Sequence, residues 1–120
     1  MSSLHETIRW VRGNTRPLLK FTLKDRNTGD PYDPDTWLPL DLTGTTVTMQ
    51  FRRTGTTTVI DTLSSTFDTD GTDGKVTFTM TALAADNPKG NYEGEIDIDF
   101  GLSNLLTVYD VVPFLFREGF

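Results

Sequence analysis

Three aspartates close together in one glycine-containing stretch are the residues best placed to do chemistry. Asp68, Asp70 and Asp73 fall within six positions, and calcium prefers a flexible loop rich in carboxylate oxygens. The EF-hand pattern is incomplete, because the twelfth position from Asp68 is Thr79 and not a glutamate. The alternative, which we favour, is a tight hairpin whose aspartates accept hydrogen bonds from their own backbone.

A second group of carboxylates occupies every other position of one expected strand, on the side opposite its apolar residues. Like charges about 7 Å apart along a strand repel, so we expect arginines from a neighbouring strand or subunit to pair with them. Arg52 and Arg53 are candidates for this pairing. Two interpretations stay open, a solvated face that discourages aggregation and a docking face for another protein. The acidic residues are Glu93, Glu95, Asp97 and Asp99.

The C-terminal stretch 111–120 begins with six consecutive apolar residues, 111–116, unlike the other expected strands. Such a strand needs cover on both sides, because large apolar patches are rarely left bare. Either the chain buries both sides itself or another protein covers one of them, and we hypothesise that this stretch docks a neighbouring subunit. The residues assigned to that docking are Phe114, Leu115, Phe116 and Phe120.

Tyr32 and Trp37 lie in a loop rich in proline and aspartate, where two aromatic rings could form a platform for a sugar. The favoured alternative is that Trp37 folds back over the end of the domain, since a buried aromatic ring contributes more stability than an exposed one.

Further along, Tyr92 opens an expected strand after Gly90. That pattern resembles a tyrosine corner, in which the phenol bonds to nearby backbone.

The remaining composition argues against catalysis and against several kinds of partner. The chain has no cysteine, no Gly-x-Ser-x-Gly motif and a single histidine, His5, so nucleophilic triads are excluded. A carboxylate pair for glycoside hydrolysis stays open, because its separation is a property of the fold. We expect no enzyme activity and no cofactor. The net charge of −6 disfavours nucleic acid and membrane surfaces as partners, and no apolar run is long enough to span a bilayer.

Strict alternation of apolar and polar residues predicts the elements that position these groups. The chain contains 21 threonines, a residue type that favours strands. About seven strands, a number typical of a sandwich, and one short helical turn at 81–86 are expected within a single domain, 1–120, with 1–6 as a flexible arm. The expected strands are 7–11, 19–23, 46–51, 57–63, 76–80, 95–100 and 106–116.

Six short motifs follow one another in a characteristic order: PLLKFTLKD (17–25), GDP (29–31), DLTG (41–44), VTMQF (47–51), DGKVTF (73–78) and PKGNYEGEI (88–96). Together they resemble the N-terminal immunoglobulin-like domain of phage baseplate upper proteins and related tail modules. Residues 32–40 are an insertion relative to that pattern. The resemblance implies an all-β, immunoglobulin-like sandwich of antiparallel strands.

The same resemblance implies a structural protein of a bacteriophage particle, most simply a small tail or baseplate component or adaptor. Its expected location is the virion, and its expected partners are other virion proteins and copies of itself. A capsid decoration or cement protein is an alternative of the same class. A carbohydrate-binding module for host attachment is an alternative of a different class, and it requires an exposed Trp37.

Overall fold

The structure is a computed structural model, and it describes residues 7–16, 18–25, 28–101 and 106–118. The expected flexible arm 1–6 therefore lies outside the described residues. In chain order the elements are β1 (Ile8–Val11), β2 (Leu19–Thr22), β3 (Lys24–Asp25), the 3-10 turn η2 (Pro34–Thr36), β4 (Leu38–Pro39), β5 (Thr46–Arg53), β6 (Val59–Phe67), β7 (Lys75–Phe78), α1 (Ala82–Ala85), β8 (Gly90–Asp99) and β9 (Leu106–Arg117).

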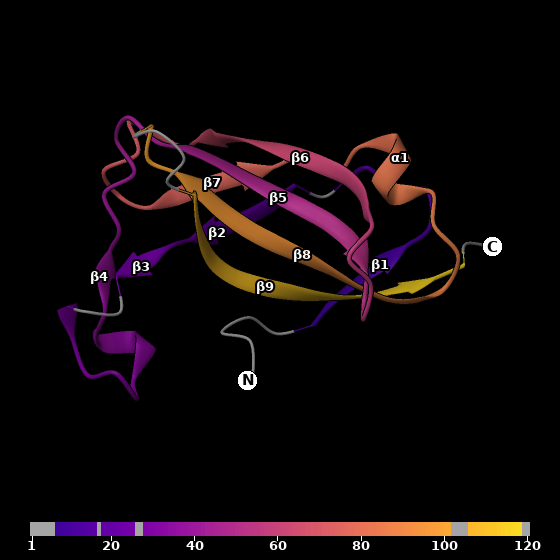
Figure 1. Cartoon of the computed structure of the whole chain (residues 1–120), viewed down its shortest axis with the longest axis horizontal. Coiled ribbons are helices and arrows are strands. Elements are labelled where there is room, and N and C mark those ends of the chain that lie inside the picture. The colour runs from indigo at the N-terminus through magenta and orange to yellow at the C-terminus, as the bar shows by residue number, and fades with distance from the viewer. Residues whose placement is uncertain (1–6, 17, 26–27, 102–105, 119–120) are drawn as a thin grey trace.

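Seven of the strands form one curled sheet in the order β1-β9-β8-β5-β6-β7-β2, and β3 pairs with β4 as a separate two-stranded sheet. The curl makes a half-barrel, with β2 and β7 passing behind β5 and β8 (Figure 1). Each of the seven predicted strands is present, so the all-β prediction is confirmed. The expectation that every strand is antiparallel is wrong, because β1 runs parallel to β9.

Strand β6 makes the sheet curl, because it pairs with different neighbours along its length. Its first part pairs with β5 up to Ser64, and its last three residues, from Ser65 to Phe67, pair with β7. The hydroxyl of Ser65 also donates to the carbonyl of Val47, at 2.6 Å. The strand therefore joins two parts of the sheet whose inner faces share one core.

The inward positions follow the alternation seen in the sequence. Along β5, for example, Val47, Met49 and Phe51 are all buried. Strand β7 departs from this rule, because Thr77, a polar position of the alternation, is only 8% exposed. Its hydroxyl donates to a carboxylate oxygen of Asp68, at 2.7 Å, and this bond satisfies the buried oxygen.

Four aromatic rings from β5, β8 and β9 form the centre of the core. Phe51 stacks on Tyr92 with ring centroids 5.5 Å apart and meets Phe114 edge to face at 5.4 Å. Phe116 lies against Tyr92 at 4.8 Å. Aromatic pairs in such geometries add about 0.5–1.5 kcal/mol each beyond the burial of their area, so this cluster fixes β9 against the middle of the sheet.

The predicted helical turn is present as α1, a single turn. Thr81 is its N-cap, and the threonine side chain accepts a hydrogen bond from the N–H of Ala84. The Thr81 hydroxyl donates in turn to Asp61 on β6, which ties the turn to the sheet. Within the described residues, no helix is long and apolar enough to cross a membrane.

Candidate interaction surface

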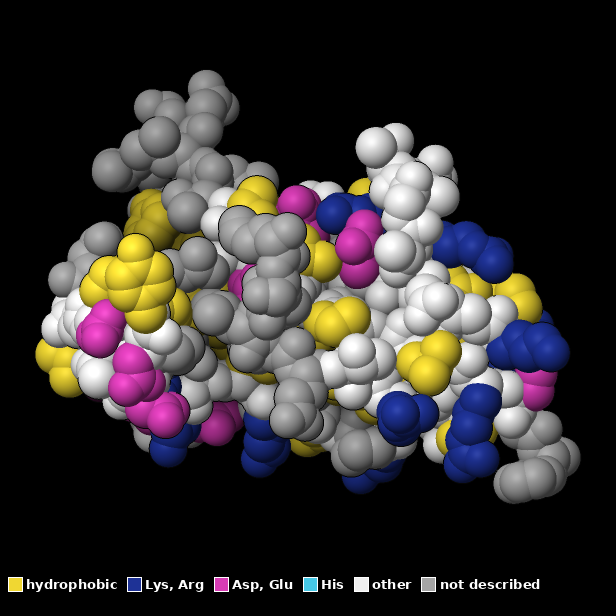
Figure 2. Space-filling model, turned by 90° about the horizontal axis from the view of Figure 1, so that it is seen from below, with side chains coloured by type: hydrophobic (Ala, Val, Ile, Leu, Met, Phe, Trp, Pro, Cys, Tyr) yellow, Lys and Arg dark blue, Asp and Glu magenta, His cyan; other side chains and the backbone are white. Residues whose placement is uncertain are grey.

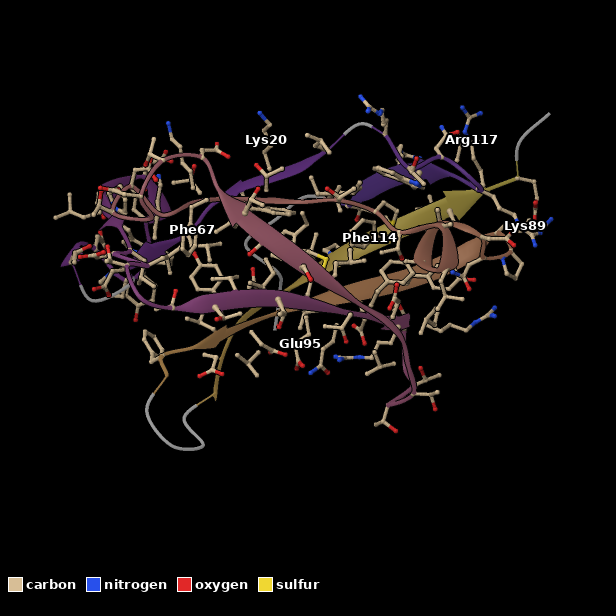
Figure 3. All side chains as sticks on the ribbon, turned by 90° about the horizontal axis from the view of Figure 1, so that it is seen from above. Lys20, Phe67, Lys89, Glu95, Phe114 and Arg117 are labelled. Carbon is tan, nitrogen blue, oxygen red and sulfur yellow. The ribbon has the colours of Figure 1, made fainter. Side chains whose placement is uncertain are left out.

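We call the side of β1, β9, β8 and β5 that points away from the aromatic core the outer face. In Figure 3, Glu95 lies on this outer side of the sheet, whereas Phe114 lies within the fold. The register sets Glu93 opposite Arg52 across the β5–β8 pair. The acidic residues predicted to share one side of a strand therefore do face outward together.

Arg52 neutralises part of the acidic group, as the sequence predicted. Its Nε lies 2.9 Å from Glu93, and one terminal nitrogen lies 3.7 Å from Glu95. The three side chains are each about one-fifth exposed, at 17%, 22% and 21%. Arg53 does not join them, because its guanidinium carbon lies 5.9 Å from the centre of the Tyr92 ring. That position allows a cation–π contact instead of an ion pair.

Asp97 is unusual among these carboxylates because it is only 1% exposed. Neither of its oxygens has a hydrogen-bond partner within the part of the chain that the structure describes. Burial, reinforced by the nearby charge of Glu95, raises the pKa of Asp97 to about 6, although Arg52 opposes the rise. Asp99 is exposed and accepts a hydrogen bond from the N–H of Gly101, at 2.8 Å. The acidic group is therefore not one uniform docking stripe.

The C-terminal strand corrects the docking prediction for two of its residues. Phe114 and Phe116 are 1% and 2% exposed, because the alternation of β9 directs them into the chain's own core. Leu115, the residue between them, is partly buried on the outer face. Phe120 lies outside the described residues. Among the described residues assigned to docking on this strand, Leu115 is the one on the outer face, and its docking role stays a prediction.

Leu115 belongs to a hollow of about 410 Å³ on the outer face. The parallel register of β1 and β9 sets Arg9 beside Leu115 and Val11 beside Arg117. These four side chains are the described residues that line the hollow. They form two apolar surfaces between two guanidinium groups, an arrangement suited to protein contacts.

The hollow depends on a strand pairing that the sequence alone did not predict. Alternation already placed Arg9 and Val11 on the side of β1 opposite Ile8 and Trp10. No local pattern, however, showed that β1 would lie beside β9 and bring Leu115 to the same place.

The aspartate-rich turn between β6 and β7 confirms the hairpin interpretation. Asp70 accepts hydrogen bonds from the backbone N–H and the hydroxyl of Thr72, at 3.0 and 2.6 Å. These bonds lower the pKa of Asp70. Asp73 accepts the N–H of Lys75 at 3.1 Å, and Asp68 binds the buried threonine of β7. Among the described residues, no group of three carboxylates or other ligands could hold a metal ion.

The aromatic pair does not form a sugar platform. Trp37 is only 6% exposed, and its indole N–H donates to the carbonyl of Asp30, at 2.7 Å. Tyr32 is 94% exposed. The favoured interpretation of Trp37 as a buried residue is confirmed, and the alternative of a two-ring glycan site is wrong because one of its rings is covered.

The tyrosine prediction is confirmed at Tyr92. Its hydroxyl donates to the carbonyl of Pro88, four residues earlier, at 2.8 Å, while its ring is 2% exposed. The bond closes the turn that leads into β8. Tyr92 therefore has a structural role in the described fold.

Comparison with known proteins adds no relative. The chain matches no protein-family model, and no curated protein matches it at a significant level.

Proposed function

We propose that this chain is a non-enzymatic structural component of a bacteriophage particle, located in its tail or baseplate, where it acts through protein–protein contacts. The observation that carries the proposal is the hollow on the outer face. It combines Val11 and Leu115 with two arginines, and interface centres favour apolar side chains together with arginine. The order of the six sequence motifs, which resembles that of phage baseplate upper proteins, supports a phage particle as the place where the chain acts.

We also propose that the half-barrel is a variant of the immunoglobulin-like sandwich. Three features support this relation. Strand β6 is shared between the β5 side and the β7 side, β1 runs parallel to the last strand, and Tyr92 bonds to backbone at the start of β8. A crystal structure in which β2 and β7 do not pack over β5 and β8 would refute it.

The partners in this proposal are other virion proteins and copies of the same chain. Cofactors, nucleic acid and membranes have no part in it. The net charge of −6 is unfavourable for contact with phosphate-rich surfaces. The ion pairs of Arg52 with Glu93 and Glu95 neutralise part of the negative charge on the outer face, which lowers the electrostatic cost of placing this region against a neighbour.

The test uses particles of the phage that encodes the chain. Mass spectrometry of purified particles should detect the chain in a fixed copy number, and gold-labelled antibody should place it on the tail in electron micrographs. Labelling of the head would replace the tail location with a decoration role. Presence in infected cells but absence from purified particles would refute the proposal.

A variant phage then tests the surface. Leu115→Asp should leave the protein folded but strongly reduce its incorporation into particles, because a carboxylate replaces an apolar side chain inside the hollow. The matched control is Leu83→Asp on α1, where Leu83 is 62% exposed and lies outside the hollow. Equal incorporation of both variants would show that the outer face is not the contact surface.

A further inference from the structure

Charge is distributed unevenly over the long axis of the molecule, which measures 44 Å against 30 and 27 Å for the other two axes. Figure 2 shows acidic side chains gathered at the β3–β4 end, while most basic side chains lie toward the opposite end. The sequence near β1 is basic as well, because residues 9–16 include three arginines and no acidic residue.

The acidic end carries a projecting loop between β3 and β4 (Figure 1). Its tip holds three exposed aspartates around an aromatic residue, Tyr32, that is 94% exposed. A free aromatic ring of this kind is a common anchor in protein interfaces. The three aspartates are Asp30, Asp33 and Asp35.

Internal bonds hold the loop tip in one shape. The Asp30 carboxylate accepts the N–H of Tyr32 at 2.9 Å, and the Asp30 carbonyl accepts the indole of the buried Trp37 at 2.7 Å. The Asp30 N–H donates to the hydroxyl of Thr36 at 2.8 Å. A loop ordered before binding loses less entropy on association, so the tyrosine is presented as a preformed projection.

The opposite end carries a surface that complements this loop. The hollow of about 410 Å³ is bounded by Arg9 and Arg117, with Val11 and Leu115 between them. The described residues that line it include no acidic side chain. Apolar walls suit an aromatic ring and guanidinium groups suit carboxylates. Figure 3 places Arg117 at the end of the molecule away from β3 and β4, so one copy cannot fill its own hollow.

We propose that the chain associates head to tail with a second copy of itself, the β3–β4 loop of one copy entering the β1–β9 hollow of the next. Tyr32 contacts Val11 and Leu115, and the loop aspartates face Arg9 and Arg117. Because the two halves of the contact are different surfaces, the association continues into a ring or a filament and does not stop at a symmetric dimer.

A single loop in a hollow buries less area than a standard interface, so each contact is weak, with a Kd on the order of 100 µM. Sedimentation of the purified protein from about 10 µM to about 1 mM should show association that weakens between about 0.05 M and 0.5 M salt, because exposed charge pairs are screened. A protein that stays monomeric at about 1 mM in low salt would overturn the inference.

Two variants remove one half of the contact each. Arg9→Glu alters only the hollow, and the double variant Tyr32→Ala with Asp33→Lys alters only the loop. Each should weaken self-association at least about tenfold. Circular dichroism checks that both remain folded, and Arg9→Ala repeats the hollow test without introducing a repulsive charge. Self-association of the variants at wild-type strength would place the contact elsewhere and overturn the inference.

Mixing the two variants is the decisive measurement. The Arg9→Ala protein retains an intact loop, and the Tyr32→Ala/Asp33→Lys protein retains an intact hollow. Together they should form a one-to-one dimer that grows no further, because the reverse pairing has neither the aromatic ring nor opposite charges at positions 9 and 33. A mixture that stays monomeric, although wild type associates, would exclude the head-to-tail contact. Lys20→Glu, the same charge reversal at an exposed position of β2 outside the hollow, should associate like wild type. An equal loss in this control would show a general charge effect and no defined contact.

This inference rests on the proposed structural function, yet the two can fail separately. A one-to-one dimer from the mixture, with the chain missing from purified particles, would refute the phage role alone. A chain present in particles whose mixture stays monomeric would refute the head-to-tail contact alone.

Discussion

Replacing Asp97 with asparagine should stabilise the protein at neutral pH. The pKa of Asp97 rises from 3.8 to about 6, and a tenfold change in proton affinity corresponds to about 1.4 kcal/mol. Ionisation of Asp97 therefore lowers the free energy of unfolding by about 2 to 3 kcal/mol above pH 6. An asparagine side chain cannot ionise, so the Asp97→Asn variant avoids this cost.

The effect depends on pH with a defined sign. Because the pKa of Asp97 is higher in the folded state, the stability linked to it is fully present below pH 3.8 and is lost as the pH rises through about 6. Wild type and Asp97→Asn should therefore unfold at similar temperatures at about pH 4, while at about pH 8 the variant should melt about 10 °C higher. Thermal melts followed by circular dichroism at several pH values measure this difference.

A control on an exposed carboxylate makes this prediction specific. Asp99→Asn changes an exposed carboxylate on the same strand and should shift the melting temperature little at about pH 8. Asp41 and Asp70 have lowered pKa values because threonine side chains donate hydrogen bonds to them, so their stabilising effect is lost only below about pH 4. If Asp97→Asn melts below wild type at about pH 8, the carboxylate has a stabilising partner and the reasoning about its burial is wrong.

Three further outcomes follow from other parts of the structure. Tyr92→Phe should lower the free energy of unfolding by about 1 kcal/mol, since it removes the hydrogen bond to Pro88. Urea titration measures this change, and an unchanged unfolding midpoint would contradict the prediction. Gly94→Ala should destabilise the fold by about 1–3 kcal/mol, because the new Cβ would lie 2.4 Å from the sulfur of Met49, and the same titration tests it. Calcium and a chelator should give the same melting temperature, because Asp70 is already bonded within its turn; a clear rise with calcium would restore the metal hypothesis.

Much of the fold could be predicted from local alternation. Strand β5 illustrates why, since every second residue from Val47 to Phe51 is apolar and each of these is buried. Alternation identifies a strand and its inner side, but it does not show which strand pairs with it or whether the two run parallel or antiparallel. The parallel pairing of β1 with β9 was missed for that reason. The two-residue strands β3 and β4 were missed because Lys24–Asp25 and Leu38–Pro39 are too short to show a period.

The candidate surface was less predictable than the fold. The pairing of Arg52 with the acidic strand followed from charge and spacing. The burial of Asp97 could not be predicted in this way. Tertiary packing decides whether an outward-facing side chain is covered, and the alternation of residue types carries no information about it. Phe114 and Phe116 face the core together with Val112, but residues 111–116 are apolar at every position, so alternation could not show which side of the strand faces inward.

The parallel pair of β1 and β9 also determines how the protein responds to mechanical tension. Ile8 lies beside Phe114 and Val11 beside Arg117, and the pair is extended by a hydrogen bond from the N–H of Arg12 to the carbonyl of Arg117, at 2.8 Å. A force that pulls the chain outward before Ile8 and after Arg117 would slide the two strands along each other in opposite directions. All the hydrogen bonds between them would then bear the load together, whereas an antiparallel hairpin pulled at its open end separates one bond at a time.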